Sequence, residues 1–446
     1  MATTLATLTA LINTTRVLDD LHTLRTFGGT GGGSWGYGVS RRALTSPDVA
    51  SRQWVAQRMA DAGLRSVRLD GLGTVYGEGG DAKAPALLMG SHSDTQPEGG
   101  WLDGALGVVF ALEAARVLHE GGAPAAWAVI DFQDEEGRFS TLTGSRAFSG
   151  VDPPPPLELP ELLNGRVAAG LTERPLLTHA NARDMPTSSW MGFFEAHIEQ
   201  GPQLEAAGAA VGVVSSIVGM RQLRLTFIGK QGHAGGSPMV ERADASLAAM
   251  RYATALDAAI HASCTVDGAD VCDGAVWTFP DLAGFVSHST IPGEANLTLQ
   301  FRAPSEGPLE KIHELARAHC DADDDQRAAS GLPRLSSARP VTCSMRLARK
   351  SVRAADMDDE LEACVGAAAK SAAGSGGVLT LPSRALHDAS VVSTVMPAAM
   401  LFVPSIDGVS HSFDEHTHEA DIAVGARAYV QAAAGMVLRQ CAAPRT

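Results

Sequence analysis

The sequence of 446 residues contains only six cysteines, and no two of them form a Cys-x-x-Cys pair. Structural zinc sites need closely spaced cysteines and small disulfide-stabilised folds need many, so the sequence argues against both classes. We therefore expect reduced thiols, which suit a protein of the cytoplasm. The cysteines are Cys264, Cys272, Cys320, Cys343, Cys364 and Cys441.

Long apolar runs and basic residues are also scarce. No stretch reaches the 18 apolar residues of a membrane span, and residues 1–15 lack the basic residue that opens a signal peptide. Lysine and arginine number 35 against 50 aspartates and glutamates, which gives a net charge of -15. An acidic surface repels nucleic acid and anionic lipid. We expect no nucleic-acid partner, no membrane partner and a cytoplasmic location.

Short apolar runs that alternate with helical patterns predict the main fold. Residues 86–89 and 127–132 have the character of buried strands, and residues 105–118 between them have helical spacing. This alternation is typical of an α/β fold with a mixed, mostly parallel sheet covered by helices.

The middle of the chain has a different pattern. Residues 215–345 combine alternating strands with helices, which predicts a smaller inserted α+β domain with an antiparallel sheet. The catalytic domain is then discontinuous and consists of residues 1–214 and 346–446.

Histidines and carboxylates follow the predicted strands of the catalytic domain. Parallel sheets carry their sites beyond the carboxyl ends of the strands, so we expect these side chains to converge. Imidazole and carboxylate suit a divalent metal with open positions, and two metals roughly 3.5–4 Å apart would acidify a water and polarise a carbonyl. The pattern predicts a metallohydrolase. The candidate donors are His92, Asp103, Glu135, Glu136, His197 and His411.

The positions of these donors suggest individual roles. Asp103 lies at the start of a predicted helix, and its two oxygens could bridge two cations. Asp94, two residues after His92, is expected to accept the second imidazole N–H with its carboxylate. Of the adjacent Glu135 and Glu136, one can bind metal while the other acts as the general base.

In these and further segments, the chain resembles the amidase/hydantoinase/carbamoylase branch of the dinuclear-zinc aminoacylase and carboxypeptidase superfamily. This branch includes N-carbamoyl-L-amino-acid hydrolases, β-ureidopropionases and allantoate amidohydrolases. The matching segments are Gly90–Thr95, Gly99–Gly107, Asp134–Gly137, Gly144–Ala147, His197–Pro202, His233–Met239, His387–Ala389 and Phe402–Ser412.

The resemblance implies a zinc-peptidase-like catalytic domain with two divalent metals per subunit. Zinc or manganese would be expected, and cobalt or nickel would also suit the donors. Glu135 would be the general base. One metal would be held by His92, Asp103 and His197, and the other by Asp103, Glu136 and His411.

The resemblance also implies residues that bind substrate and build the assembly. The insert would be a lid and dimerisation domain, and His233 would reach the active site of the partner subunit to stabilise an oxyanion. Arg302 would clamp the substrate carboxylate, since its fork suits bidentate binding. Gln200 and His387 match further substrate-contact positions.

Several residues depart from the family pattern near the substrate. Ser289 replaces an asparagine, Gln300 an aspartate, and Arg384 and Leu386 replace two glycines, while Trp101 stands where a smaller or basic residue is frequent. The metal chemistry should be retained while the substrate pocket differs.

We expect a homodimeric amidohydrolase that cleaves a linear C–N bond in an N-carbamoyl or related N-substituted amino acid carrying a carboxylate. An N-acyl amino acid deacylase or dipeptidase of the wider superfamily is the enzymatic alternative. A homologue that binds ligands without catalysis is the alternative from another class.

Overall fold

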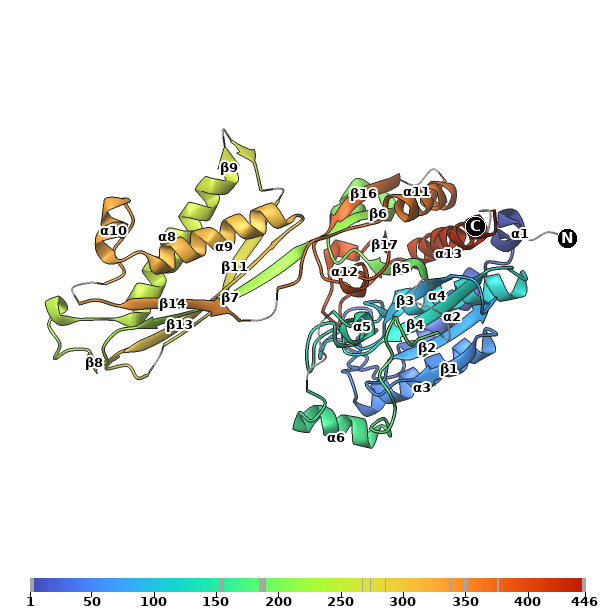
Figure 1. The fold of residues 1–446 in the computed structure, drawn as a ribbon, viewed down its shortest axis with the longest axis horizontal. Helices are drawn as coiled ribbons and strands as arrows, with labels where there is room; N and C mark the ends of the chain where they lie inside the picture. The colour runs from blue at the N-terminus through green and yellow to red at the C-terminus, as the bar shows by residue number, and fades with distance from the viewer. Residues whose placement is uncertain are drawn as a thin grey trace. The chain divides into compact units, whose positions relative to one another are not determined.

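A computed structural model gives the fold of this chain (Figure 1). Within the residues that it describes, no helix is both long and apolar enough to cross a lipid bilayer. The described residues are 4–151, 156–183, 190–266, 268–272, 274–284, 286–336, 339–348, 351–374 and 377–442.

The chain divides into two compact units. The first consists of residues 1–216 and 356–446, and the second of residues 217–355. The divisions therefore fall at 216/217 and 355/356, whereas the sequence pattern placed them at 214/215 and 345/346.

A nine-stranded mixed sheet forms the centre of the first unit, in the order β1-β2-β4-β3-β5-β17-β6-β15, with β16 paired to β6. The neighbours β4, β3, β5 and β17 are parallel, whereas β1, β2 and β6 pair antiparallel. The strands are β1 (Arg65–Leu69), β2 (Val75–Gly80), β3 (Ala86–His92), β4 (Ala126–Phe132), β5 (Trp190–Ile198), β6 (Ala209–Ile217), β15 (Ala355–Asp356), β16 (Gly377–Ser383) and β17 (Ala398–Val403).

Helices cover this sheet because its strands are apolar on both faces, with β3, β4 and β17 buried throughout. Leu87 and Met89 of β3 and Phe194 of β5 belong to one core cluster with side chains of α4, α11 and α13. The helices of this unit are α1 (Leu5–Thr9), α2 (Thr14–Leu24), α3 (Ser46–Asp61), α4 (Ala105–Glu120), α5 (Thr143–Ser149), α6 (Pro160–Ala168), α7 (Gln203–Ala207), η2 (Ile406–Gly408), α11 (Asp359–Ala373), α12 (Asp388–Val392) and α13 (Glu419–Ala442).

Chain order and spatial order differ at the centre of the sheet. Strand β17, from the last fifth of the chain, pairs with β5 so that Phe402 lies opposite His197 (Figure 1). The discontinuous α/β unit brings the end of the chain to the strands of its first half, and the predicted fold class is confirmed.

The second unit is built around a four-stranded antiparallel sheet in the order β11-β13-β7-β14. A separate two-stranded sheet pairs β8 with β12, and another pairs β9 with β10. Its elements are β7 (Gly219–Ile228), β8 (Gly232–His233), η1 (Met239–Glu241), α8 (Ala245–Cys264), β9 (Thr265–Val266), β10 (Ala269–Asp270), β11 (Val276–Ala283), β12 (Thr290–Ile291), β13 (Glu294–Ala303), α9 (Glu306–Asp321), α10 (Asp324–Ala329) and β14 (Thr342–Leu347).

The expectation that all cysteines are free thiols is wrong. Cys264 and Cys272 form a disulfide with a Cα–Cα distance of 5.1 Å. Cys264 ends α8, and the β9–β10 hairpin returns the chain so that the Val271 amide donates to the Cys264 carbonyl. Of the other described cysteines, Cys320, Cys343 and Cys364 are free.

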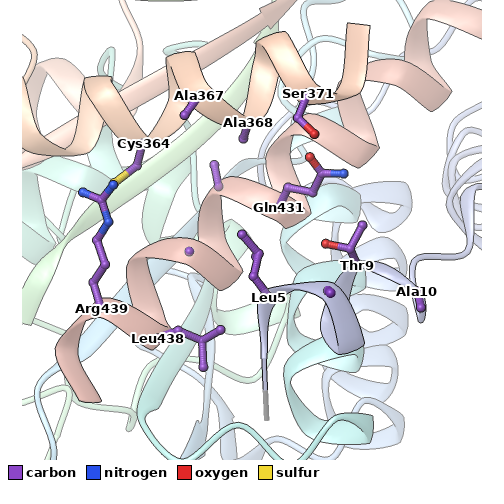
Figure 2. Close-up of a pocket in the computed structure, with 13 residues that line it drawn as sticks. Leu5, Thr9, Ala10, Cys364, Ala367, Ala368, Ser371, Gln431, Leu438 and Arg439 are labelled. Carbon is purple, nitrogen blue, oxygen red and sulfur yellow. The ribbon is translucent and has the colours of Figure 1, made fainter. Parts of the chain in front are cut away.

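A large apolar cavity lies in the first unit between α1, α11 and α13 (Figure 2). Its volume is about 940 Å³, and its walls include Leu5, Ala368 and Leu438. None of the residues that line it is a candidate site residue, so the polar site described below is a separate feature.

Candidate metal centre

The predicted metal donors come together at the carboxyl ends of the parallel strands. They form two overlapping groups in which the donor atoms lie within 4.8 Å of one another, and Asp103 belongs to both. The first group is His92, Asp103 and His197, and the second is Asp103, Glu136 and His411.

The first group presents two imidazole Nε2 atoms to one carboxylate oxygen. Asp103 Oδ1 lies 3.6 Å from His92 Nε2 and 3.1 Å from His197 Nε2. Each ring donates its Nδ1–H to a backbone carbonyl, His92 to Asp94 at 3.1 Å and His197 to Ile198 at 2.9 Å. This leaves the Nε2 lone pair of His92 open to a metal, while His197 Nε2 accepts the Gly104 N–H at 3.1 Å beside Asp103 Oδ1. Burial lowers the pKa of His92 to about 3, so its ring is neutral, as metal binding requires.

The second group uses the other oxygen of Asp103. Its Oδ2 atom lies 3.3 Å from His411 Nε2, and Glu136 Oε2 lies 3.5 Å from the same nitrogen. Burial opposes the charge on Asp103, but His197 and the other nearby imidazoles outweigh it and hold the pKa of this carboxyl well below its usual range. Asp103 is thus ionised, with one oxygen facing each group. This arrangement fits a carboxylate that bridges two divalent cations.

The backbone is held in uncommon conformations around this centre. Asp134, Gln200 and His411 have φ angles of 57°, 58° and 52°, which non-glycine residues rarely adopt. Such strain persists only where surrounding contacts fix the chain, and it is concentrated at functional sites.

Glu415 positions Asp103, and sequence reasoning missed it. Its side chain is 0% exposed, and Oε1 accepts the backbone N–H groups of Leu102 and Asp103, each at 3.0 Å. The Ser410 hydroxyl lies 3.1 Å from both Glu415 Oε2 and Asp103 Oδ2. Burial and the nearby Asp103 charge raise the pKa of Glu415 to about 7. Glu415 packs so closely on this segment that a Cβ on Gly100 would lie 2.1 Å from its carboxyl carbon.

Glu135 lies beside the first group, as a general base would. Its Oε2 atom is 3.6 Å from His92 Nε2. Burial, together with the charges of Glu136 and Asp388, raises the pKa of Glu135 well above its usual value. A carboxyl with a raised pKa is suited to accept and release a proton near neutral pH.

Asp94 supports this region differently from the prediction. Its carboxylate is 3.9 Å from His92 Nδ1, and its backbone carbonyl accepts the imidazole proton instead. The carboxylate accepts the backbone N–H groups of Glu135 at 3.4 Å and Glu136 at 3.3 Å. It also pairs with Arg52 Nη2 at 3.2 Å, which draws it away from the imidazole.

Arg52 is a second residue that sequence reasoning missed. It is 1% exposed and forms ion pairs with three buried carboxylates: Asp48 at 2.9 Å, Asp94 at 3.2 Å and Asp131 at 3.1 Å. This network connects α3 to the loop that carries Glu135.

The remaining predicted residues of the first unit differ in their surroundings. Gln200 donates its amide to Asp103 Oδ2 at 2.9 Å, so it lies at the metal centre. His387 is buried, with its ring 4.5 Å from the ring of His197 and its Nε2 atom 2.8 Å from Ser383 Oγ. Arg384 is exposed and Leu386 is half-buried in the loop before α12. Their roles toward substrate stay predictions. Trp101 is buried and donates to His416 Nδ1 at 3.3 Å.

The predicted residues of the second unit lie on its strands and loops. His233 is exposed on β8, and its Nδ1 atom accepts the backbone N–H groups of Gly235 at 3.1 Å and Gly236 at 2.9 Å. Ser289 is exposed next to β12, and its carbonyl accepts the Ala234 N–H at 2.8 Å. Arg302 is half-buried on β13, and burial lowers its pKa.

Comparison with known proteins decides the family. The model of peptidase family M20/M25/M40 matches residues 88–435. The chain belongs to this family. The family and the two donor groups together indicate use of a divalent metal.

Individual proteins similar to this chain indicate its branch within the family. Allantoate deiminase 2 of Glycine max is 32% identical over 410 residues, which cover 86% of this chain and 82% of that protein. N-carbamoyl-L-amino-acid amidohydrolase of Paenarthrobacter aurescens is 32% identical over 412 residues, 87% of this chain and 91% of that protein. The crystal structure of an amidase of the hydantoinase/carbamoylase family from Burkholderia phymatum has a TM-score of 0.77 and 37% identity, covering 96% of this chain and 98% of that one.

These comparisons confirm the predicted resemblance to the amidase/hydantoinase/carbamoylase branch. They also confirm the predicted enzyme class, a hydrolase that acts on C–N bonds other than peptide bonds.

Proposed function

We propose that this protein hydrolyses the linear C–N bond of an N-carbamoyl amino acid or a related ureido acid that carries a carboxylate. The observation that supports this most directly is the pair of Asp103 oxygens, which face two separate His/carboxylate groups beside Glu135. The named substrates of the similar proteins are allantoate and N-carbamoyl-L-amino acids, which contain ureido and carboxylate groups.

The donor groups are suited to two divalent cations. His92, Asp103 and His197 would hold one, and Asp103, Glu136 and His411 the other. When bound, such cations lower the pKa of water and polarise a carbonyl oxygen. Zinc or manganese is our first expectation, and cobalt or nickel also suits these ligands.

Glu135 would move the proton in this reaction. Its carboxylate would take a proton from the attacking water and then deliver it to the leaving nitrogen, which departs as a neutral amine. For a carbamoyl substrate, one water is consumed, and the products are the amino acid, carbon dioxide and ammonia.

Two residues of the second unit would bind the reacting molecule. Because Nδ1 of His233 accepts two backbone N–H groups, the neutral ring carries its proton on Nε2, where it can donate to an oxyanion. Arg302 would bind the substrate carboxylate with two parallel N–H bonds. Ser289, Arg384, Leu386 and His387 would shape the pocket.

The insert, residues 217–355, would serve as a lid and as the surface of a homodimer, with His233 completing the site of the partner subunit. This part of the proposal follows from the resemblance and from the separate core of the insert. The cytoplasmic location also stays a prediction.

Ammonia release tests the proposal. We would load purified protein with Zn²⁺ or Mn²⁺ and supply N-carbamoyl-L-amino acids, β-ureido acids and allantoate. We expect turnover on at least one, and Glu135→Gln should lose it while retaining metal. Release of amino acid from N-acyl substrates without ammonia from any ureido acid would identify a deacylase instead. Metal binding without turnover of any amide would identify a non-catalytic homologue.

A further inference from the structure

The two donor groups are held by different kinds of contacts. In the first group, backbone carbonyls fix the buried rings of His92 and His197. In the second group, side-chain amides hold the carboxylates. Gln96 Nε2 donates to Glu136 Oε2 at 2.7 Å, and Gln200 Nε2 donates to Asp103 Oδ2 at 2.9 Å.

The two amides contact the same carboxylate oxygens that face His411, the histidine of the second group. Glu136 Oε2 and Asp103 Oδ2 are the atoms that lie 3.5 Å and 3.3 Å from His411 Nε2. A hydrogen bond to a carboxylate oxygen fixes its direction and occupies part of its lone-pair capacity. His411 itself has a side chain that is 51% exposed, so this group is closer to solvent than the first.

Gln96 fixes the whole carboxylate of Glu136. Its backbone N–H donates to Oε1 at 3.2 Å, while its side-chain amide contacts Oε2 and also the Glu136 carbonyl at 3.3 Å. Gln96 lies four residues after His92, on the loop that follows β3. The loop that leaves the first group therefore positions a ligand of the second.

We propose that Gln96 is a positioning residue that sets the affinity of the second cation subsite, and that this subsite binds its cation more weakly than the first. The inference rests on the proposed dinuclear site. Removing the amide releases Glu136 Oε2, the oxygen that faces His411, while the backbone N–H of residue 96 still holds Oε1, and it does not touch His92 or His197. Loss of such an outer contact typically weakens metal binding about 10- to 100-fold.

Gln96→Met tests this because it keeps the length of the side chain and removes the donor. We would dialyse metal-free protein against a series of buffered free Zn²⁺ concentrations and measure bound zinc per subunit. The wild type should bind two equivalents in two steps. The variant should bind the first with unchanged affinity and the second about 10- to 100-fold more weakly.

Gln57→Met is the matched control. Its amide donates to Asp61 Oδ1 at 2.8 Å on the exposed face of α3, so the same chemical change occurs away from the centre. This variant should match the wild type in both steps. An intact first step in Gln96→Met also shows that the variant is folded.

The outcomes separate this inference from the proposed function. If the wild type binds two equivalents and Gln96→Met binds both equally well, the role of Gln96 is refuted while the function stands. Two wild-type steps of equal affinity would refute the inequality of the subsites. If the wild type binds fewer than two equivalents, the dinuclear site fails, and the inference fails with it.

Discussion

Replacing Arg52 with methionine should destabilise the first unit strongly. The guanidinium is 1% exposed and pairs with Asp48, Asp94 and Asp131, which are equally buried. Removing one partner of a buried ion pair costs about 3–5 kcal/mol, because the remaining charge has no compensation. Since whole domains have free energies of unfolding of about 5–15 kcal/mol, the loss is a large share of the total.

Arg58→Met is the control on the same helix. Arg58 pairs with Asp61 at 2.5 Å, but the two side chains are 35% and 42% exposed. Water screens such pairs, so this substitution should cost less than about 1 kcal/mol. Urea denaturation followed by tryptophan fluorescence would compare the two variants with the wild type.

The pH dependence provides a second check on this reasoning. Burial raises the pKa of Asp94 and Asp131, and Arg52 opposes that shift. Without Arg52, their folded-state pKa values rise further above the unfolded value of about 3.9. A carboxyl with a raised folded pKa destabilises the native state increasingly as pH rises above the unfolded pKa. The deficit of Arg52→Met should therefore be larger at pH 8 than at pH 5. Equal losses for both arginine variants, or a deficit independent of pH, would refute the argument.

Two further substitutions test the metal centre. Gly104 has a φ of 64°, and a Cβ there would lie 2.4 Å from His92 Nε2, so Gly104→Ala should displace this ligand and abolish tight binding of one cation. Gly122→Ala shares the positive φ but meets nothing within 4 Å, so its metal content should remain normal. Glu415→Met should weaken metal binding by about tenfold, because it removes the oxygen that accepts the Leu102 and Asp103 N–H groups and positions Asp103. If the Glu415 variant had the thermal stability and the zinc affinity of the wild type, the positioning role of Glu415 would be contradicted.

The buried strands could be predicted because a strand that is covered on both faces has an almost continuous apolar sequence. The run expected at 86–89 is β3, Ala86–His92, and the run at 127–132 is β4, Ala126–Phe132. Strand β2 was missed because it contains three glycines, which have low strand propensity. Its pairing depends on a distant partner: a Cβ on Gly79 would lie 2.4 Å from Trp127 Nε1, so the large ring occupies the space of a side chain.

The members of the two candidate donor groups could be named from the sequence because histidine and carboxylate side chains are typical metal ligands. The residues that hold them could not, because they act across long separations. Glu415 contacts the backbone of Leu102, 313 positions away, and nothing near it in the sequence indicates that partner. Asp94 does lie near His92, as expected. Its carboxylate, however, pairs with Arg52, which is 42 positions away in the sequence, and no local pattern indicates this contact.

The concentration of buried carboxylates at this centre explains why bound cations would stabilise it. Burial gathers Glu135, Glu136 and Glu415 around Asp103 and raises the pKa of Glu136 to about 8 and of Glu415 to about 7. Nearby carboxylates repel one another, and the low polarity of the interior strengthens that repulsion. Divalent cations that bind only the folded state would relieve it and stabilise the fold by mass action. The same crowding of carboxylates that raises the pKa of Glu135 would therefore couple metal binding to folding.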